Sequence, residues 1–144
     1  MPEFIPEHAD PRGHNLDDFT IGYLGCAEWL ARCYWNRDGS ERDDYDLTDD
    51  ERSRLRGFTR KAIAEAKADC KAFQKANKAD LALYCELSGR GMDSAGMDFF
   101  LSRNGHGAGF FDRGNEPVFG RLQEAARVWS NREATLYRNW LTWE

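Results

Sequence analysis

The sequence lacks the features that mark several common functional classes. None of its four cysteines forms a C-x-x-C pair, so a zinc ribbon is not expected. No apolar run approaches the roughly 20 residues of a membrane span, and we expect no signal peptide. P-loop, nucleophile-elbow and metal-triad motifs are absent as well. We therefore expect a cytoplasmic protein with reduced thiols, no membrane contact, and no cofactor or metal.

The bulk composition predicts a folded protein with an acidic surface. Of the 144 residues, 41% are hydrophobic and 13% are aromatic, and a chain of this kind can bury a core. The net charge of −5 gives no general reason to expect nucleic-acid binding, and an acidic surface favours a basic protein partner. The five tryptophans would permit an exposed aromatic patch and hence a homodimer.

The N-terminal part of the sequence changes from a proline-rich stretch to a helical pattern. Three of the four prolines fall in residues 1–15, which we expect to be an extended arm, and residues 16–144 are expected to form a single domain. A helix capped by Asn15 is predicted over 16–35, and Gly22 and Gly25 would permit another element to approach it closely. Its buried stripe is predicted to comprise Phe19, Tyr23, Cys26, Leu30 and Cys33, widened by Trp29 and Tyr34.

A second, longer helix is predicted over 48–87. Thr48 and Glu51 have the spacing of a capping box, and apolar residues then recur with helical periodicity. At 1.5 Å per residue this helix would be about 60 Å long. Because that is long for a domain of this size, we expect a break near 77–80 or an end near 88–89.

Opposite charges are concentrated in two neighbouring segments. Residues 36–50 are acidic, but an EF-hand loop starting at Asp38 would have Asp49 at position twelve, where glutamate is needed. This segment is therefore interpreted as a solvated loop or as a contact for a basic partner, made by Asp43, Asp44 and Asp46. Residues 52–78 hold nine bases and two acids, which indicates either a phosphate-binding face or a solvated helix.

The densest group of chemically capable side chains lies in residues 98–113. Two short aromatic runs flank a stretch rich in glycine, and Asn104-Gly105 is typical of a tight turn. We therefore predict a β-hairpin with arms near 98–103 and 108–113. Its candidate binding residues are Asp98, Arg103, Asn104, His106, Asp112 and Arg113.

The remaining segments complete an α+β prediction. Residues 89–96 are expected to be a loop, 118–130 a short helix, and 133–144 a C-terminal β-hairpin. The predicted order is two N-terminal helices, a β-hairpin, a short helix and a second β-hairpin. The helices are expected to pack on one face of a small antiparallel sheet.

The stretch 96–114 also resembles a signature of small uncharacterised proteins encoded by bacteriophages and related mobile elements. Those proteins typically read D-F-W-L-T-R-N-G-H-G-A-G-F-W-D-R-G; here Phe100 and Phe111 replace tryptophan and Ser102 replaces threonine. Weaker similarity extends the match over roughly residues 19–137. The resemblance implies the origin of the chain, an accessory protein of a phage or mobile element, and implies no particular activity.

Three interpretations of the 98–113 stretch remain open: a structural turn, a binding site or a catalytic site. His106 can titrate near neutrality and the arginines could hold a phosphate, but no second catalytic histidine or metal triad accompanies them. Our leading hypothesis is a non-enzymatic protein that binds a host protein and inhibits a defence system of the anti-CRISPR or anti-restriction type. The alternative is a nucleotide- or nucleic-acid-binding protein, with hydrolysis as a further option, in which the basic face of residues 52–78 and the cluster of Arg103, His106 and Arg113 would meet phosphate.

Overall fold

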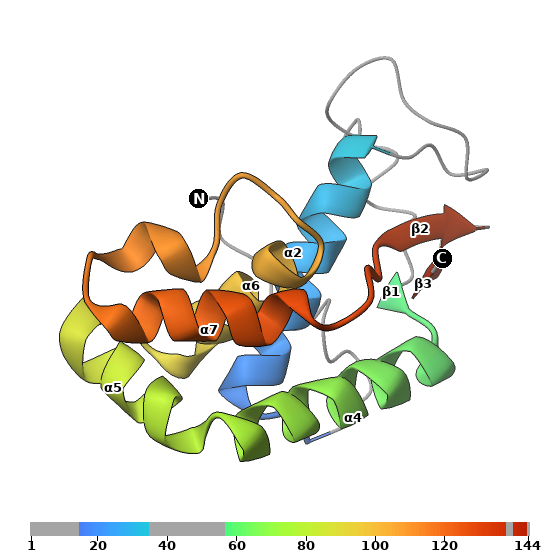
Figure 1. The fold of residues 1–144 in the computed structure, drawn as a ribbon. Coiled ribbons are helices and arrows are strands. Elements are labelled where there is room, and N and C mark those ends of the chain that lie inside the picture. The colour runs from blue at the N-terminus through green and yellow to red at the C-terminus, as the bar shows by residue number, and fades with distance from the viewer. Residues whose placement is uncertain (1–14, 35–56, 138–139, 144) are drawn as a thin grey trace.

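The computed structural model describes residues 15–34, 57–137 and 140–143 (Figure 1). In chain order, the elements are α2 (Asp18–Tyr34), β1 (Gly57–Phe58), α4 (Arg60–Ala76), α5 (Lys78–Ser88), α6 (Met92–Arg103), the 3₁₀ helix η1 (Phe110–Arg113), α7 (Pro117–Arg127), β2 (Ala134–Tyr137) and β3 (Trp140–Trp143). Over these residues the protein is mostly helical with one small sheet, which confirms the α+β class.

The sheet lies beside the start of α4 (Figure 1). Its strand order is β1-β3-β2. β2 and β3 form the predicted C-terminal hairpin, with Ala134 opposite Trp143, whereas β1 runs parallel to β3, with Gly57 opposite Trp140. The indole Nε1 of Trp143 donates a hydrogen bond to the carbonyl of Ala62 in α4 at 2.9 Å. The sheet is therefore mixed, and the expectation of a purely antiparallel sheet was wrong.

Helices α2 and α6 are in backbone contact, and two glycines permit it. A β-carbon at Gly22 of α2 would overlap the carbonyl group of Asp93, and one at Gly96 of α6 would overlap the carbonyl group of Phe19. Any side chain at either glycine would therefore push the helices apart. This confirms the close approach that was predicted at Gly22.

Helix α6 lies inside the core. Every residue from 95 to 103 is buried, and aromatic rings from neighbouring helices surround it. Phe99 stacks on Phe73 of α4 with ring centroids 4.1 Å apart, and Phe100 meets Tyr23 of α2 edge-on at 5.3 Å. Such contacts stabilise a core beyond the burial of apolar area.

The prediction of a hairpin over 98–113 was wrong, and the loop expected over 89–96 is limited to residues 89–91. The first expected arm belongs to α6, which begins at Met92, and the second belongs to η1. A helix that is buried on every side has no polar face, so its sequence lacks the 3.6-residue period that identifies most helices. The aromatic runs therefore had the appearance of short buried strands.

The other helices agree with prediction more closely. α2 falls within the range expected for it, α7 begins one residue before its expected range of 118–130, and the long second helix breaks at Asn77, between α4 and α5. α5 then ends at Gly89, whose φ of 71° is left-handed. Of the stripe predicted on α2, Phe19, Tyr23, Cys26 and Leu30 are buried, and the side chain of Cys33 lies outside the described residues.

Three details of these helices differ from prediction. Asp17 rather than Asn15 caps α2, accepting a hydrogen bond from the amide of Thr20 at 2.8 Å. Trp29 is 39% exposed and does not widen the buried stripe. α4 begins after its N-cap, Thr59, because the two preceding residues form β1. The capping box expected at Thr48 lies outside the described residues.

The glycine contact between α2 and α6 predicts a sharp contrast between two types of Gly→Ala substitution. Gly96→Ala should destabilise the protein by about 1–3 kcal/mol or more, because the added methyl group collides with backbone that cannot rotate away. Gly120→Ala lies on α7 with open space around it and should stabilise by up to about 1 kcal/mol. Urea unfolding of both variants would measure this, and equal stability would contradict the contact.

Candidate functional site

Asp98 is fully buried in α6, and three donors surround its carboxylate. Arg113 of η1 binds both oxygens, with Nε 2.8 Å from Oδ2 and Nη2 2.7 Å from Oδ1. The hydroxyl of Tyr84 on α5 donates to Oδ2 at 2.7 Å. Desolvation, followed by the charge of Asp98, raises the pKa of Tyr84, so this hydroxyl remains a donor. The bidentate ion pair fastens η1, and the tyrosine hydrogen bond fastens α5, to the centre of the core.

Arg103, at the end of α6, is 4% exposed and is also satisfied internally. Its Nη1 lies 2.7 Å from Oδ2 of Asp69 on α4 and 3.1 Å from the hydroxyl oxygen of Tyr23 on α2. Its Nε donates to the carbonyl of Ser130 at 2.7 Å, and the guanidinium lies 5.2 Å from the ring centroid of Trp129. One side chain therefore joins α2, α4, α6 and the segment after α7.

Asn104 and Gly105 terminate α6 instead of joining two strands. The amide of His106 donates to the carbonyl of Leu101 at 3.0 Å, and the amide of Gly105 donates to that of Ser102 at 3.3 Å. Gly105 has a φ of 73°. These two bonds and the left-handed glycine form a Schellman motif. Asn-Gly favours both this cap and a hairpin turn, because both need a residue that tolerates positive φ.

Two contacts hold the turn after α6 against the segment before β2. Nε2 of His106 lies 2.6 Å from Oε1 of Glu133, and Oδ1 of Asn104 accepts a hydrogen bond from the amide of Arg132 at 2.6 Å. The His106 ring stacks on Phe100 with centroids 6.1 Å apart. A histidine oriented by a carboxylate is one component of a general base. Among the described residues, however, no serine, threonine or cysteine is hydrogen-bonded to this imidazole.

Ser102 and Asp112 support the turn from α6 into η1. The buried hydroxyl of Ser102 donates to Oε1 of Gln123 on α7 at 2.6 Å and accepts from the amide of Phe110 at 3.1 Å. A β-carbon at Gly109 would overlap this hydroxyl. Asp112 accepts a hydrogen bond from the amide of Gly109 at 3.1 Å. Ser102 is thus a structural residue rather than an accessible nucleophile.

The structure distributes the predicted site residues over several internal contacts. Each basic side chain of the proposed phosphate cluster has a carboxylate partner: Arg103 with Asp69, His106 with Glu133, and Arg113 with Asp98. Asn104 and Asp112 bind backbone amides. Much of the binding capacity of these side chains is therefore used within the fold. The other candidates, Asp43, Asp44 and Asp46, lie outside the described residues.

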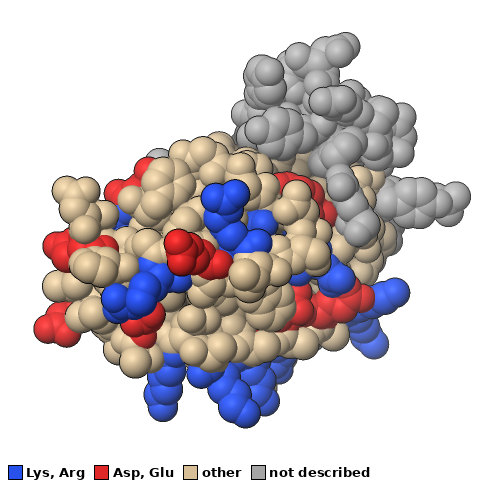
Figure 2. All heavy atoms as spheres, viewed as in Figure 1, with Lys and Arg blue, Asp and Glu red and all other residues tan. Residues whose placement is uncertain are grey.

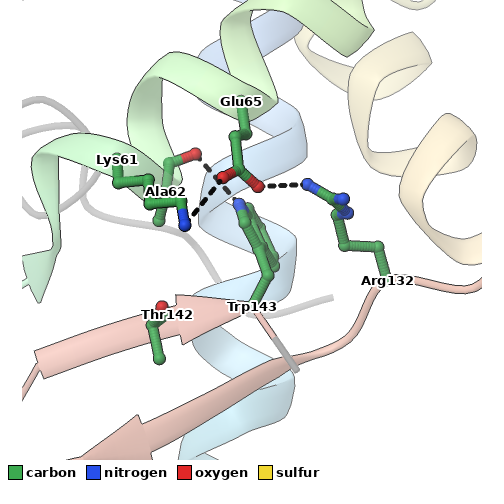
Figure 3. A pocket seen from close by; sticks show the side chains of 6 residues that line it. All are labelled: Lys61, Ala62, Glu65, Arg132, Thr142 and Trp143. Atoms are coloured by element: carbon green, nitrogen blue, oxygen red, sulfur yellow. Dashed lines mark hydrogen bonds and ion pairs between the residues drawn. The ribbon is translucent and has the colours of Figure 1, made fainter.

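A cavity of about 260 Å³ that the sequence did not indicate lies between α4 and the sheet (Figure 3). It is lined by Lys61, Ala62, Glu65, Arg132, Thr142 and Trp143. The carboxylate of Glu65 lies between two cations, bound to Arg132 and 4.0 Å from Nζ of Lys61. The lining comes from three separate segments, so no local motif could have revealed it. With two cations and one carboxylate, the cavity carries one net positive charge.

The cysteines described in the structure do not form a reactive site. Cys26 and Cys70 are buried, as expected of small core residues, and desolvation raises the pKa of both thiols. Cys85 is partly buried, and its sulfur lies 3.7 Å from that of Met92.

Within the described ranges, no group of three or more His, Cys, Asp or Glu residues could hold a metal ion. None of the helices there is long and apolar enough to cross a membrane.

Comparison with known proteins adds no assignment: no protein-family model, curated protein or solved structure matches the chain. The site must therefore be interpreted from its own geometry. Asp98, Arg103, Asn104 and Ser102 connect elements, and the partly exposed His106–Glu133 pair and the Glu65 cavity remain accessible to solvent.

The buried pair of Asp98 and Arg113 predicts a large and specific stability effect. Arg113→Met should cost about 3–5 kcal/mol, because it leaves the carboxylate of Asp98 buried and without its cation. The double variant Asp98→Asn/Arg113→Met should be less destabilised than Arg113→Met alone, since position 98 then carries no unpaired buried charge. Chemical unfolding of the set would measure both effects.

Arg121→Met provides a matched control for this prediction. Arg121 also forms a bidentate pair, with Asp80, but its side chain is 52% exposed. Solvent screens such a pair, so its loss should barely change the free energy of unfolding. If Arg113→Met were as mild as this control, Asp98 would not depend on Arg113.

Proposed function

We propose that this chain is a non-enzymatic accessory protein of a bacteriophage or mobile element that acts by binding a host component. We further propose that this component is a protein of a bacterial defence system of the CRISPR or restriction type. The proposal rests on the resemblance of residues 96–114 to the phage-type signature and on the contacts that these residues form within the protein. The observation that carries it is the internal pairing of the signature's charged side chains.

This pairing supports a binding protein over an enzyme. Catalytic groups need access to a substrate and a matched partner in the reaction. Asp98, Ser102 and Arg103 are buried and engaged within the protein, so they serve the fold instead. A rigid small domain of this kind can act through its outer surface.

The alternative, a nucleotide- or nucleic-acid-binding protein that uses Arg103, His106 and Arg113, has weaker support. Arg103 is 4% exposed, and a phosphate would have to displace Asp69 to reach it. Arg113 would have to release the buried carboxylate of Asp98, which is costly. His106 is the one member of the three that a ligand could approach without breaking a buried ion pair.

A phage-protection assay with pull-down tests the proposed function. The tagged protein is expressed in bacteria with and without an active CRISPR or restriction system, plaques are counted, and bound host proteins are identified. Expression should raise plating efficiency only in the defended strain, and a component of that system should copurify. No rescue in any defended strain, together with no copurifying defence component, would reject the proposal.

The acidic segment predicts a charge-dependent contact. Asp43→Asn/Asp44→Asn/Asp46→Asn should weaken binding of a basic host partner and reduce the salt dependence of that binding. The matched control is Glu86→Gln/Asp93→Asn/Glu124→Gln, which removes three exposed carboxylates elsewhere. Equal binding by the two variants would show that this acidic segment is not the contact.

A further inference from the structure

The outer side of α4 carries a row of exposed bases. The members of this row are Arg60, Lys67, Lys71 and Lys75, with Lys78 following at the start of α5. At about 100° per residue, the four on α4 fall within an arc of about 80°. They extend over about 22 Å along the helix axis, and Lys71 and Lys75 are about 6 Å apart along it. Figure 2 shows Lys and Arg side chains projecting from the edge of the molecule where α4 lies in Figure 1.

The two acids of α4 are directed away from this row. Glu65 is bound to Arg132 and Asp69 to Arg103, so each carboxylate is used by an arginine from another element. Asp17 at the start of α2 lies close enough to act on Lys67: desolvation raises the pKa of Asp17, but hydrogen bonds from Thr20 and Gln74 and the charge of Lys67 leave it lowered. No described carboxylate pairs with Lys71 or Lys75.

We propose that this lysine face of α4 binds the phosphate backbone of double-stranded nucleic acid without sequence preference. Like charges four residues apart weaken a helix, and an anionic ligand would relieve that repulsion. A duplex carries one negative charge about every 1.7 Å of its axis, so a 22 Å row faces enough phosphates for every base in it. The net charge of −5 does not prevent this, because exposed acids more than about 10 Å away are screened at 0.1 M salt.

The composition of the face favours nucleic acid over a protein partner. The residues beside the bases on this face include two exposed alanines, Ala64 and Ala68. Lysine and alanine are both depleted in protein–protein interfaces, which rely on aromatic and arginine side chains. The face also lacks an exposed aromatic residue on which an unpaired base could stack, so a duplex fits better than a single strand.

This inference is separate from the proposed function. It concerns α4, whereas the proposed function rests on the phage-type signature and requires only that some host component be bound. The plaque assay and the binding assay below can therefore fail independently.

Fluorescence anisotropy with a labelled 30-base-pair duplex of arbitrary sequence tests the proposal with the full chain. Binding should be measurable at 50 mM NaCl, and log K should fall with log salt with a slope near −3.6, about 0.9 for each of four phosphate contacts. Lys71→Gln/Lys75→Gln should lower the affinity by about tenfold or more and reduce the slope by about 2.

A matched variant separates this face from net charge. Arg90→Gln/Arg127→Gln also removes two exposed positive charges, on elements other than α4, and should bind as the unmodified protein does. Circular dichroism confirms that both variants remain folded, as expected for exposed substitutions with similar helix propensity.

Three results would overturn the proposal. The first is no binding to the duplex at 50 mM NaCl and 100 µM protein. The second is an equal loss of affinity in both double variants, because this would assign the effect to net charge. The third is tighter binding to the single strand or to polyglutamate than to the duplex, which would indicate a different ligand for this face.

Discussion

Asp98 lies on a helix whose last two turns have no solvent-facing side, and this burial constrains the structure around it. A carboxylate in such a place must be matched by donors, and Arg113 and Tyr84 supply them. Arg103 at the end of the same helix meets the same requirement with Asp69, Tyr23 and a backbone carbonyl. These groups define how α4, α5, η1 and the segment before β2 are placed around α6.

Close packing of α2 on α6 completes this arrangement. The backbones touch at Gly22 and Gly96, which brings the aromatic rings of both helices into one cluster with Phe73 of α4. A core of aromatic rings and buried ion pairs tolerates little displacement, because each ring and each charge has one set of neighbours. The stretch over residues 96–114 therefore supplies much of what holds this fold together.

The charges divide between the inside and the outside of the molecule in an orderly way. The acids of α4 and the arginines of the signature are used for internal ion pairs, and the lysines of α4 are left in solvent. A chain with a net charge of −5 thus presents a positive surface along α4. The charged side chains of residues 98–113 therefore stabilise the fold, and the exposed lysines of α4 are the charges that a partner can reach.

The sequence by itself determined α2, α7, the last hairpin and the break at Asn77, because each carries a local signal: an apolar stripe, alternating residues or a helix-breaking stretch. It did not determine α6, since a helix buried on every side loses its period, nor the role of Asn104-Gly105, which suits a helix cap and a hairpin equally. Only the tertiary structure assigned a partner to each charge of the candidate site. Asp69 and Glu133 are distant in sequence from their partners Arg103 and His106, and the sequence does not show which arginine Asp98 binds. Such pairing depends on how the helices pack.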